Sequence, residues 1–519
     1  MKLKLFVVAT LFVLQASIAV VAQQPNASQR SYQQARRVLD DAIEAHGGVE
    51  ALRGIKDFTL KEKGKLYARY QSPAAEGSPT VGTSEETLII DTERGFVFDE
   101  LKTANGAGFN NWTRTVVKGT EGYNYDMWSK TVTPINNPSL NNFRGQMRRL
   151  PPIVLIEALD RAATLRWVGE DEIGGRKQKV ISVIRPDNQQ LSLAFDAQTN
   201  LLTRYGFLYA DPIAGDSEIA QTYSNYRTIG KVKFPSARVL YNAGGMVQEA
   251  EFTDLQVNTK PADSVFQGPD GFEKLAAGPA TPPPPAVSKI ADDVYMLEGL
   301  AGGTHNILFV AFNDHVLVLE APEQIFYGST SVQALAKIKE TVPGKPIKYL
   351  VLSHHHSDHA GGFREYVAAG ATIVTTPGNK SYLEKAAAVQ SSLLPRLSLK
   401  DKLKIETIAN KKRVFQDDKH VVELYDIGPN PHANEILVAY FPKEKILFQA
   451  DLLNAAANGN IPIAQDATIS FADGLQQLGL QVEKIYGVHG RFATPEELRT
   501  AVERRRASEL KTDVSSGPK

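Results

Sequence analysis

Four histidines and one aspartate fall within six consecutive positions of the run 353–362 (SHHHSDHAGG). The residues before it, 347–353 (IKYLVLS), are apolar and β-branched, which predicts a buried strand ending where the run begins. In an extended chain, side chains at i and i+2 share a face, so His354 and His356 can converge on one ion. His355 has the opposite parity and is expected to point away.

The second half of the run predicts a turn toward a second ion. Gly361 and Gly362 supply backbone freedom, and the turn brings Asp358 and His359 round to the same region. Imidazole and carboxylate ligands suit zinc and related first-row metals, and the absence of cysteine excludes thiolate sites. The ligand-type residues outnumber one tetrahedron and lie beside glycines, which favours an open catalytic site over a closed structural one.

Three further residues are placed to complete such a site. His432 lies in a turn-rich loop, while Asp451 and His489 directly follow the short strand-like runs 445–450 and 484–488. Any one of them alone is more often a satisfied polar group than a ligand. Their joint occurrence at strand ends and loops after the cluster predicts ligands, and a carboxylate has two oxygens with which to bridge two cations.

The remaining histidines are assigned other roles. His305 and Asn306 follow a glycine-rich turn and are predicted to line the substrate groove, with a plain hairpin role as the alternative. His315 and His420 lie in polar turn or charged segments and are expected to be solvated. His46 lies at a predicted helix end, where a cap is expected.

Taken together, the chemistry-bearing residues resemble the metallo-β-lactamase-fold metallohydrolase superfamily over about residues 290–505. The resemblance implies an α+β protein whose C-terminal half is an αββα sandwich with a metal groove at one edge. It implies that the first ion is held by His354, His356 and His432, the second by Asp358, His359 and His489, and that both share Asp451.

Some positions depart from the usual family pattern. Ser353 stands where threonine is usual, Val488 replaces a glycine, and Glu320 occupies a strand end that is commonly aspartate. None of these changes removes a ligand. Asp451 resembles the glyoxalase II, lactonase and ribonuclease Z side of the superfamily, because class B β-lactamases generally have cysteine or serine there.

The resemblance predicts a binuclear zinc hydrolase in which a metal-bridging hydroxide attacks an ester, lactone, thioester or amide, with Asp358 also orienting the water. Two Zn²⁺ ions are the expected cofactors, with iron or manganese as alternatives. One competing interpretation is a mononuclear iron enzyme like the persulfide dioxygenases, using His354, His356, His432 and Asp451. Another is a non-catalytic exported protein that binds a lipid or a protein partner.

Composition narrows the partners and the compartment. Lys plus Arg and Asp plus Glu number 58 each in 519 residues, so no net charge favours nucleic acid, and a small-molecule substrate is expected. Residues 1–22 combine early lysines, an apolar run and small residues before Gln23, which predicts a bacterial-type signal peptide. We expect a periplasmic or secreted protein without a stable membrane span after cleavage; a retained anchor is the alternative.

Breaks in composition divide the chain into parts. Residues 31–54 predict an amphipathic helix that closes at Gly47-Gly48 with one further turn, and recurring strand patterns follow it. This part loosely resembles the open, curved sheet of periplasmic lipoprotein-carrier domains, which implies a lipid or protein partner for it. The predicted parts are a signal peptide at 1–22, a helix plus antiparallel β domain at 31–272, a Pro-rich linker at 273–288, a metallo-β-lactamase-like catalytic domain at 289–505 and a flexible tail at 506–519.

Overall fold

The computed structural model describes residues 24–515 except 107, 324–328, 394–396, 398, 400 and 457–458. The predicted signal peptide and residues 516–519 of the predicted tail lie outside this range. Residues 506–515, which were expected to be part of a flexible tail, instead continue helix α11 (Pro495–Ser515). Among the described helices, none combines the length and apolar character needed to cross a membrane.

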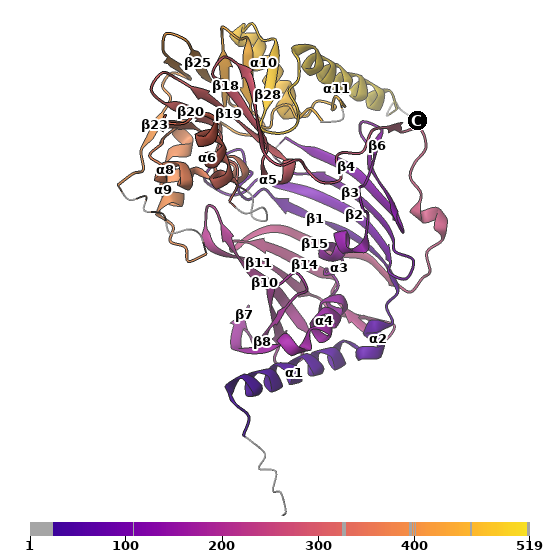
Figure 1. The fold of residues 1–519 in the computed structure, drawn as a ribbon. Coiled ribbons are helices and arrows are strands. Elements are labelled where there is room, and N and C mark those ends of the chain that lie inside the picture. The colour runs from indigo at the N-terminus through magenta and orange to yellow at the C-terminus, as the bar shows by residue number, and fades with distance from the viewer. Residues whose placement is uncertain are drawn as a thin grey trace, which may run out of the picture.

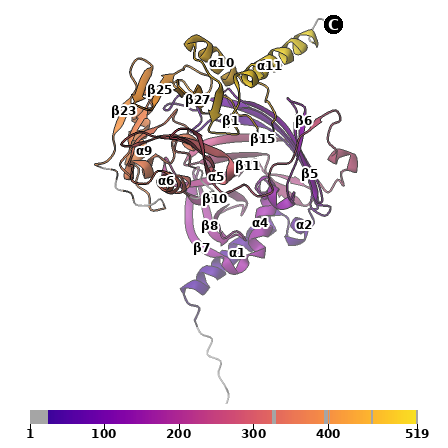
Figure 2. The ribbon, with the colours of Figure 1, turned by 45° about the horizontal axis from the view of Figure 1, so that its top comes forward.

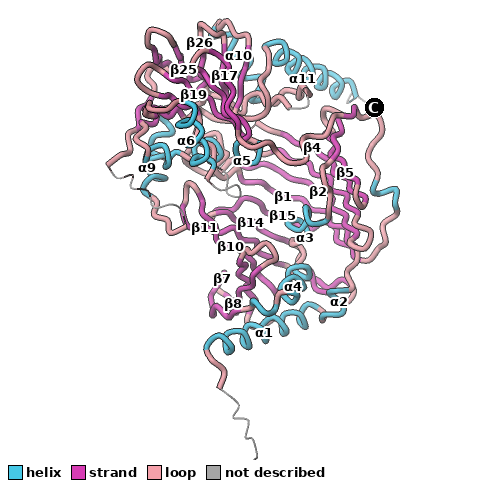
Figure 3. The backbone as a smooth tube through the Cα atoms, in the orientation of Figure 1, coloured by secondary structure: helices cyan, strands magenta, loops and turns pink. Residues whose placement is uncertain are grey.

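The N-terminal half is built on one long, curved sheet of 14 strands within the described residues (Figures 1 and 3). Its strands pair antiparallel, apart from the parallel pair that β16 forms with β6. Apolar side chains alternate along the strands, as Phe58 and Leu60 show by lying buried on one face of β1. In sheet order the strands are β16 (Glu273–Lys274), β6 (Thr131–Pro134), β5 (Glu121–Asp126), β4 (Asn110–Lys118), β3 (Phe96–Ala104), β2 (Val81–Asp91), β1 (Asp57–Tyr67), β15 (Gly245–Val257), β14 (Ala237–Asn242), β11 (Gly215–Ser224), β10 (Leu202–Asp211), β9 (Gln190–Asp196), β8 (Arg176–Ile184) and β7 (Arg166–Ile173).

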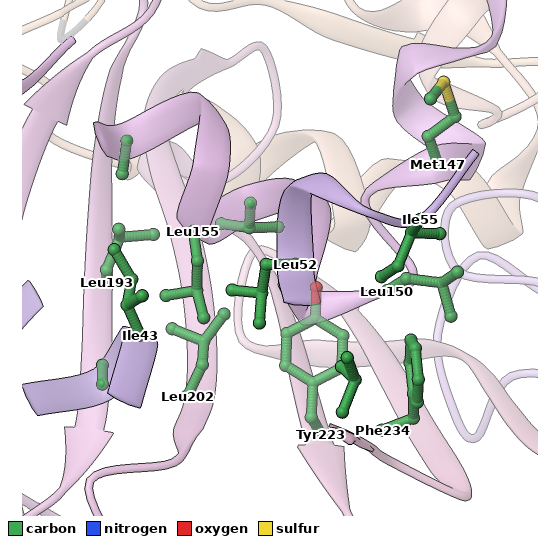
Figure 4. Packing of buried hydrophobic residues seen from close by; sticks show 14 of the residues in the cluster. Ile43, Leu52, Ile55, Met147, Leu150, Leu155, Leu193, Leu202, Tyr223 and Phe234 are labelled. Atoms are coloured by element: carbon green, nitrogen blue, oxygen red, sulfur yellow. The ribbon is translucent and has the colours of Figure 1, made fainter. Parts of the chain in front are cut away.

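Helices cover one end of this sheet. The first, α1 (Ala27–His46), starts at a capping box in which Asn26 and Gln29 bond each other's backbone, and it ends at Gly47 with φ 124°. Its buried stripe repeats at helical spacing and packs with the short helices and the β12–β13 hairpin into one apolar core (Figure 4). The other elements are α2 (Val49–Arg53), α3 (Arg144–Met147), α4 (Pro151–Asp160), β12 (Arg227–Ile229) and β13 (Val232–Phe234).

The predicted linker, 273–288, begins and ends with strand pairing. Its first residues form β16, and its last residues belong to β17 (Ala286–Ala291), which pairs with β18. The proline-rich segment runs between these two strands. Beyond it the chain enters the C-terminal half, which packs against the end of the large sheet opposite α1 (Figure 2).

The C-terminal half is a sandwich of two sheets between helices, as the family resemblance predicts. The first sheet runs β17, β18 (Val294–Gly299), β19 (His305–Ala311), β20 (Val316–Leu319), β21 (Ile347–Val351), β22 (Thr372–Thr375) and β23 (Ile405–Thr407). The second runs β24 (Lys412–Gln416), β25 (Val421–Asp426), β26 (Leu437–Phe441), β27 (Ile446–Gln449) and β28 (Lys484–Gly487). The helices are α5 (Leu300–Gly303), α6 (Thr330–Thr341), α7 (Ser357–Ala360), α8 (Phe363–Ala368), α9 (Lys380–Ala388), α10 (Asp466–Leu478) and α11.

Successive side chains of one strand point to opposite faces of its sheet, so one strand contributes to two separate cores of the sandwich. On β19, Ile307 and Phe309 share a core with residues of α6, α8 and α9, whereas Leu308 and Val310 share a core with the second sheet. On the far side, Leu447 of β27 packs with Phe471 of α10. The protein is therefore of the α+β class, with a C-terminal αββα sandwich preceded by a mainly antiparallel β-rich half.

Candidate metal centre

The histidine run begins where β21 ends, at the edge of the first sheet. Leu352 is still buried like the strand before it, and the chain then passes through His354 and His356 into the single turn of α7. His354, His356 and His359 have no exposed surface, so burial of these imidazoles depends on partners within the protein. The run therefore begins at a strand end, as the sequence predicts, and its histidine side chains lie in the interior of the molecule.

One set of side chains, the first ligand group, comprises His354, His356, His432 and Asp451, whose ligand atoms lie within 4.8 Å of one another. The Nε2 atoms of His354 and His432 are 3.1 Å apart, and Nε2 of His432 is 3.0 Å from Oδ2 of Asp451. Nδ1 of His356 is buried without a hydrogen-bond partner. Imidazole nitrogens aimed at one another in this way leave room for a shared cation rather than for hydrogen bonds.

The second ligand group comprises Asp358, His359, Asp451 and His489, again within 4.8 Å. Nε2 of His359 lies 2.8 Å from Oδ2 of Asp451 and 3.7 Å from Oδ2 of Asp358. Nε2 of His489 lies 3.0 Å from the other oxygen, Oδ1 of Asp451. All seven residues that the sequence predicts as metal ligands are therefore brought together, and Asp451 is common to both groups.

Asp451 follows β27 in a backbone conformation that favours glycine, with φ 64°. The preceding buried Gln449 holds this turn: its Oε1 accepts hydrogen bonds from the backbone N–H groups of Leu452 and Leu453, and its Nε2 donates to the carbonyl of Leu453. The side chain of Gln449 thus compensates for the local strain and directs the carboxylate of Asp451 between the two groups.

Hydrogen bonds behind the rings determine which nitrogen faces the centre. Nδ1 of His354 bonds Oγ of Ser353, at 2.8 Å, and Nδ1 of His489 bonds the carbonyl of Thr304, also at 2.8 Å. Nδ1 of His359 bonds Oε2 of Glu320 at 3.0 Å. In each case Nε2 is left for a metal ion, which is the arrangement that carboxylate and carbonyl partners impose on metal-binding histidines.

The protonation states of the ligand-type residues suit the binding of a cation. Burial lowers the pKa of His354 and of His356 well below the usual value, so both imidazoles are neutral. Burial opposes ionisation of Asp451, but neighbouring His359 outweighs it and holds the pKa of Asp451 well below its usual range. Conversely, burial would lower the pKa of His359, yet Asp451 and Asp358 raise it well above the usual value.

The donor set fits the predicted ions. Nδ1 of His356 is buried without a hydrogen-bond partner, and Nε2 of His359 faces Oδ2 of Asp451 at 2.8 Å. Imidazole and carboxylate ligands in two groups joined by one carboxylate suit zinc and other divalent first-row metals. The structure thus contains two groups of residues that could each hold a metal ion.

His355, which the strand parity turns away from the ions, belongs to neither ligand group. Its Nε2 lies 2.9 Å from the backbone carbonyl of Ser72, and its ring lies edge-on to Tyr382.

The two residues predicted to line the groove, His305 and Asn306, have different surroundings. Nε2 of His305 is buried 3.9 Å from Oδ2 of Asp358, and its ring lies 4.4 Å from that of His489.

Asn306, unlike His305, contacts the loop that carries His489 and not the ligand side chains. Its Nδ2 donates to the carbonyl of Gly490 at 2.8 Å, and its backbone N–H donates to the carbonyl of Val488 at 2.7 Å. These bonds hold both neighbours of His489. The contacts of Asn306 therefore position a ligand loop, and its contact with substrate stays a prediction.

Other residues at the centre were not assigned a role from the sequence. Glu320 was noticed there only as a departure from the usual aspartate, although it bonds His359. Gln71 and Ser72 come from the N-terminal half and contact the histidine run across more than 280 positions. Sequence spacing contains no signal for such a contact, because it depends on how the two halves pack.

Comparison with known proteins shows what the C-terminal half is similar to. Residues 328–489, which include all seven ligand-type residues, match the family model described as the metallo-beta-lactamase superfamily. Similar solved structures include metallo-beta-lactamases from Pontibacter korlensis (19% identity, TM-score 0.33, 43% of this chain and 99% of that chain) and Hirschia baltica (16%, 0.32, 43% and 98%). A third is FIM-1 from Pseudomonas aeruginosa in a mono-zinc form (17%, 0.32, 44% and 98%). None of the curated proteins compared with the chain matches it.

Proposed function

We propose that this protein is a binuclear metal-dependent hydrolase that cleaves an ester, lactone, thioester or amide. Its C-terminal half has the metallo-β-lactamase fold. The observation that carries the proposal is the position of Asp451. Its Oδ2 faces His432 and His359 at 3.0 and 2.8 Å, and its Oδ1 faces His489 at 3.0 Å. One carboxylate with oxygens directed to both ligand groups is suited to two cations.

Zn²⁺ is the proposed ion in both groups. His354, His356 and His432 would hold one ion, Asp358, His359 and His489 the other, and Asp451 both. When bound, such a pair supplies a hydroxide nucleophile at neutral pH and polarises a carbonyl oxygen. The hydrolysis therefore needs no serine or cysteine nucleophile from the chain.

The remaining steps fall to side chains at the second ligand group. Asp358 is ionised, because His359 outweighs the effect of burial and lowers its pKa, so it can accept a hydrogen bond from the attacking water and orient it. Burial lowers the pKa of His305, which keeps this imidazole neutral at pH 7. Its Nδ1 contacts Oγ of Thr304 at 2.7 Å, leaving Nε2 to face the substrate beside Asp358.

The complete second ligand group favours this function over a mononuclear iron enzyme, which would need only the first. Metal analysis of purified protein, combined with activity on lactone, thioester, β-lactam and phosphodiester substrates, tests the choice. We expect about two zinc ions per chain and hydrolysis of at least one carbonyl substrate. One iron and no zinc per chain would overturn the proposal. We further propose that the protein works in the periplasm or outside the cell, which fractionation of cells expressing the full chain would test.

A further inference from the structure

The segment 68–80 joins β1 to β2 in the large sheet and reaches the metal centre of the other half. Its base is closed by backbone and side-chain bonds: the N–H of Ala68 donates to the carbonyl of Thr80 at 3.0 Å. Oγ of Ser72 donates to the carbonyl of Ala68 at 2.8 Å and accepts from the N–H of Thr80 at 3.1 Å. These bonds give the segment, here called the capping loop, a defined shape.

The capping loop contacts two separate segments of the C-terminal half. The carbonyl of Pro73 accepts a hydrogen bond of 2.7 Å from the backbone N–H of Asn434, two residues from the ligand His432. The carboxylate of Glu76 accepts hydrogen bonds from Oγ of Ser381, at 2.7 Å, and from Nζ of Lys385, at 2.6 Å, both on α9. The capping loop thus contacts the loop that carries His432 through Pro73, and helix α9 through Glu76.

Two groups of the capping loop reach the histidine run itself. Nε2 of Gln71 donates a hydrogen bond of 2.7 Å to Oδ1 of Asp358. The carbonyl of Ser72 lies 3.1 Å from Nε2 of His356, which accounts for a proton on that nitrogen and leaves Nδ1 as the ligand atom. The N-terminal half thus provides hydrogen-bond partners for one residue of each ligand group.

We propose that Gln71 is a positioning residue of the metal centre, supplied by the N-terminal half to hold Asp358. The proposal rests on the binuclear hydrolase function. The amide occupies Oδ1 and leaves Oδ2 directed toward His359 and His305, at 3.7 and 3.9 Å. Because a neutral N–H donor stabilises the carboxylate without competing for the cation, Gln71 selects one oxygen of Asp358 as the ligand atom.

A second loop of the N-terminal half also contacts a ligand-type residue. Phe109, between β3 and β4, lies edge-on to the ring of His432 with centroids 5.1 Å apart. Among the seven ligand-type side chains, Asp358 and His489 retain the most exposure, 24% and 21%. Substrate would therefore approach at the second ligand group, where Gln71 is in place to fix the carboxylate that the substrate meets.

The test measures affinity for each zinc ion separately by competition with chelators in the full-length protein. Gln71→Met keeps the volume of the side chain but removes the donor. We expect the ion of the second ligand group, to which Asp358 belongs, to bind about 10-fold less tightly, in the range found for partners of metal ligands, while the other ion is unaffected. A general folding defect would weaken both ions and lower the melting temperature of the metal-free protein.

Glu76→Ala is the matched control on the same loop, because it removes contacts with α9 and none with the centre. We expect it to change neither zinc affinity by more than about 2-fold, well below the effect of losing a ligand's partner. Equal weakening by both variants would assign the effect to docking of the loop and overturn the role of Gln71. So would a Gln71→Met protein with wild-type affinities. If the wild-type protein binds fewer than two ions, it is the hydrolase proposal that fails.

Discussion

Oε2 of Glu320 lies 3.0 Å from Nδ1 of His359, while Oε1 of the same carboxylate accepts a hydrogen bond of 2.7 Å from the backbone N–H of Ser353. Glu320 is 1% exposed and directly follows β20. One buried side chain therefore connects the end of β20 to both ends of the histidine run. Glutamate stands here where aspartate is usual, and its longer side chain bonds the ring of His359.

Replacing this carboxylate should weaken the second ligand group. Glu320→Gln keeps the shape but has only one acceptor oxygen. If that oxygen keeps the N–H of Ser353, the NH₂ group faces Nδ1 of His359 and the ring loses its acceptor. We expect a 10- to 100-fold loss of affinity for one zinc ion, measured by chelator competition. Asp314→Asn is the control, because Asp314 bonds Nδ1 of His315 at 2.6 Å on the surface, far from the centre. Unchanged affinity in Glu320→Gln would contradict the proposed role.

Removing the shared carboxylate should affect both ions. In Asp451→Ala, each ligand group loses a member, and we expect activity to fall at least about a hundredfold, since even partners of ligands have effects of that size. Zinc content and hydrolysis measured on the same preparation check this result. Full activity in this variant would be incompatible with a carboxylate-bridged pair.

The two ions should be separable by substitution of His489. This residue contributes to the second ligand group alone, whereas His354 and His432 belong to the first. We expect His489→Ala to retain about one zinc ion per chain by elemental analysis and to lose hydrolysis. Retention of two ions would mean that the second group binds in another way.

Zinc affinity should rise with pH. In the metal-free protein, Asp451 and Asp358 raise the pKa of His359 well above its usual value despite burial, so a proton must leave before an ion binds. At higher pH this proton is already lost in more molecules, and competition with the ion weakens. Titrations of metal-free protein between about pH 6 and pH 8 should give tighter binding at the upper end. A flat profile would show that no proton is displaced.

Asp99 of the large sheet should make the protein less stable as pH rises, whereas zinc affinity should increase. Burial, together with the charge of Glu86, raises the pKa of Asp99 from 3.8 to about 7. Between these values the folded protein keeps a proton that the unfolded chain has lost, so the free energy of unfolding falls as pH rises from about 4 to about 7. Asp99→Asn should remove this dependence and stabilise the protein at pH 7 by about 1–4 kcal/mol, since one pKa unit equals about 1.4 kcal/mol.

Thermal melting at several pH values measures this effect. Asp254→Asn serves as the comparison, because Asp254 is a partly exposed carboxylate of the same sheet and lies 3.9 Å from Lys61. The same slope in wild type and Asp99→Asn would rule out Asp99 as its source.

Features encoded in local sequence were predicted well. The buried strand before the histidine run follows from its apolar, β-branched pattern, and the αββα sandwich was implied by the family resemblance. The three later residues follow strands or lie in a loop, as expected, and they lie beside the run. The leading helix was also recognised, although it begins at Ala27 because Asn26 provides a cap. Strands with polar composition, such as β4 (NNWTRTVVK) and β11 (GDSEIAQTYS), were missed because few of their residues are apolar.

Features that depend on packing between distant segments were not predictable. Gln71 and Phe109 contact the centre only because the large sheet packs against the sandwich. His315 and His420 were expected to be solvated, and this prediction is wrong. Both pack against Phe312, with ring centroids 5.0 and 5.9 Å away, and His420 is only 4% exposed. For His420 the aromatic neighbour is far away in the sequence, so its flanking residues give no sign of this contact. For His315 the neighbour is only three positions away, and the polar residues between them concealed the packing.

The backbone conformation of Asp451 limits which substitutions are useful at this position. Its φ of 64° is one that glycine adopts without strain and asparagine tolerates well. A chain selected only for a high melting temperature would drift to one of those residues here, and would lose the shared carboxylate. The aspartate thus marks a position where stability and activity oppose each other, so stabilisation of this protein by choosing locally preferred residues should exclude it.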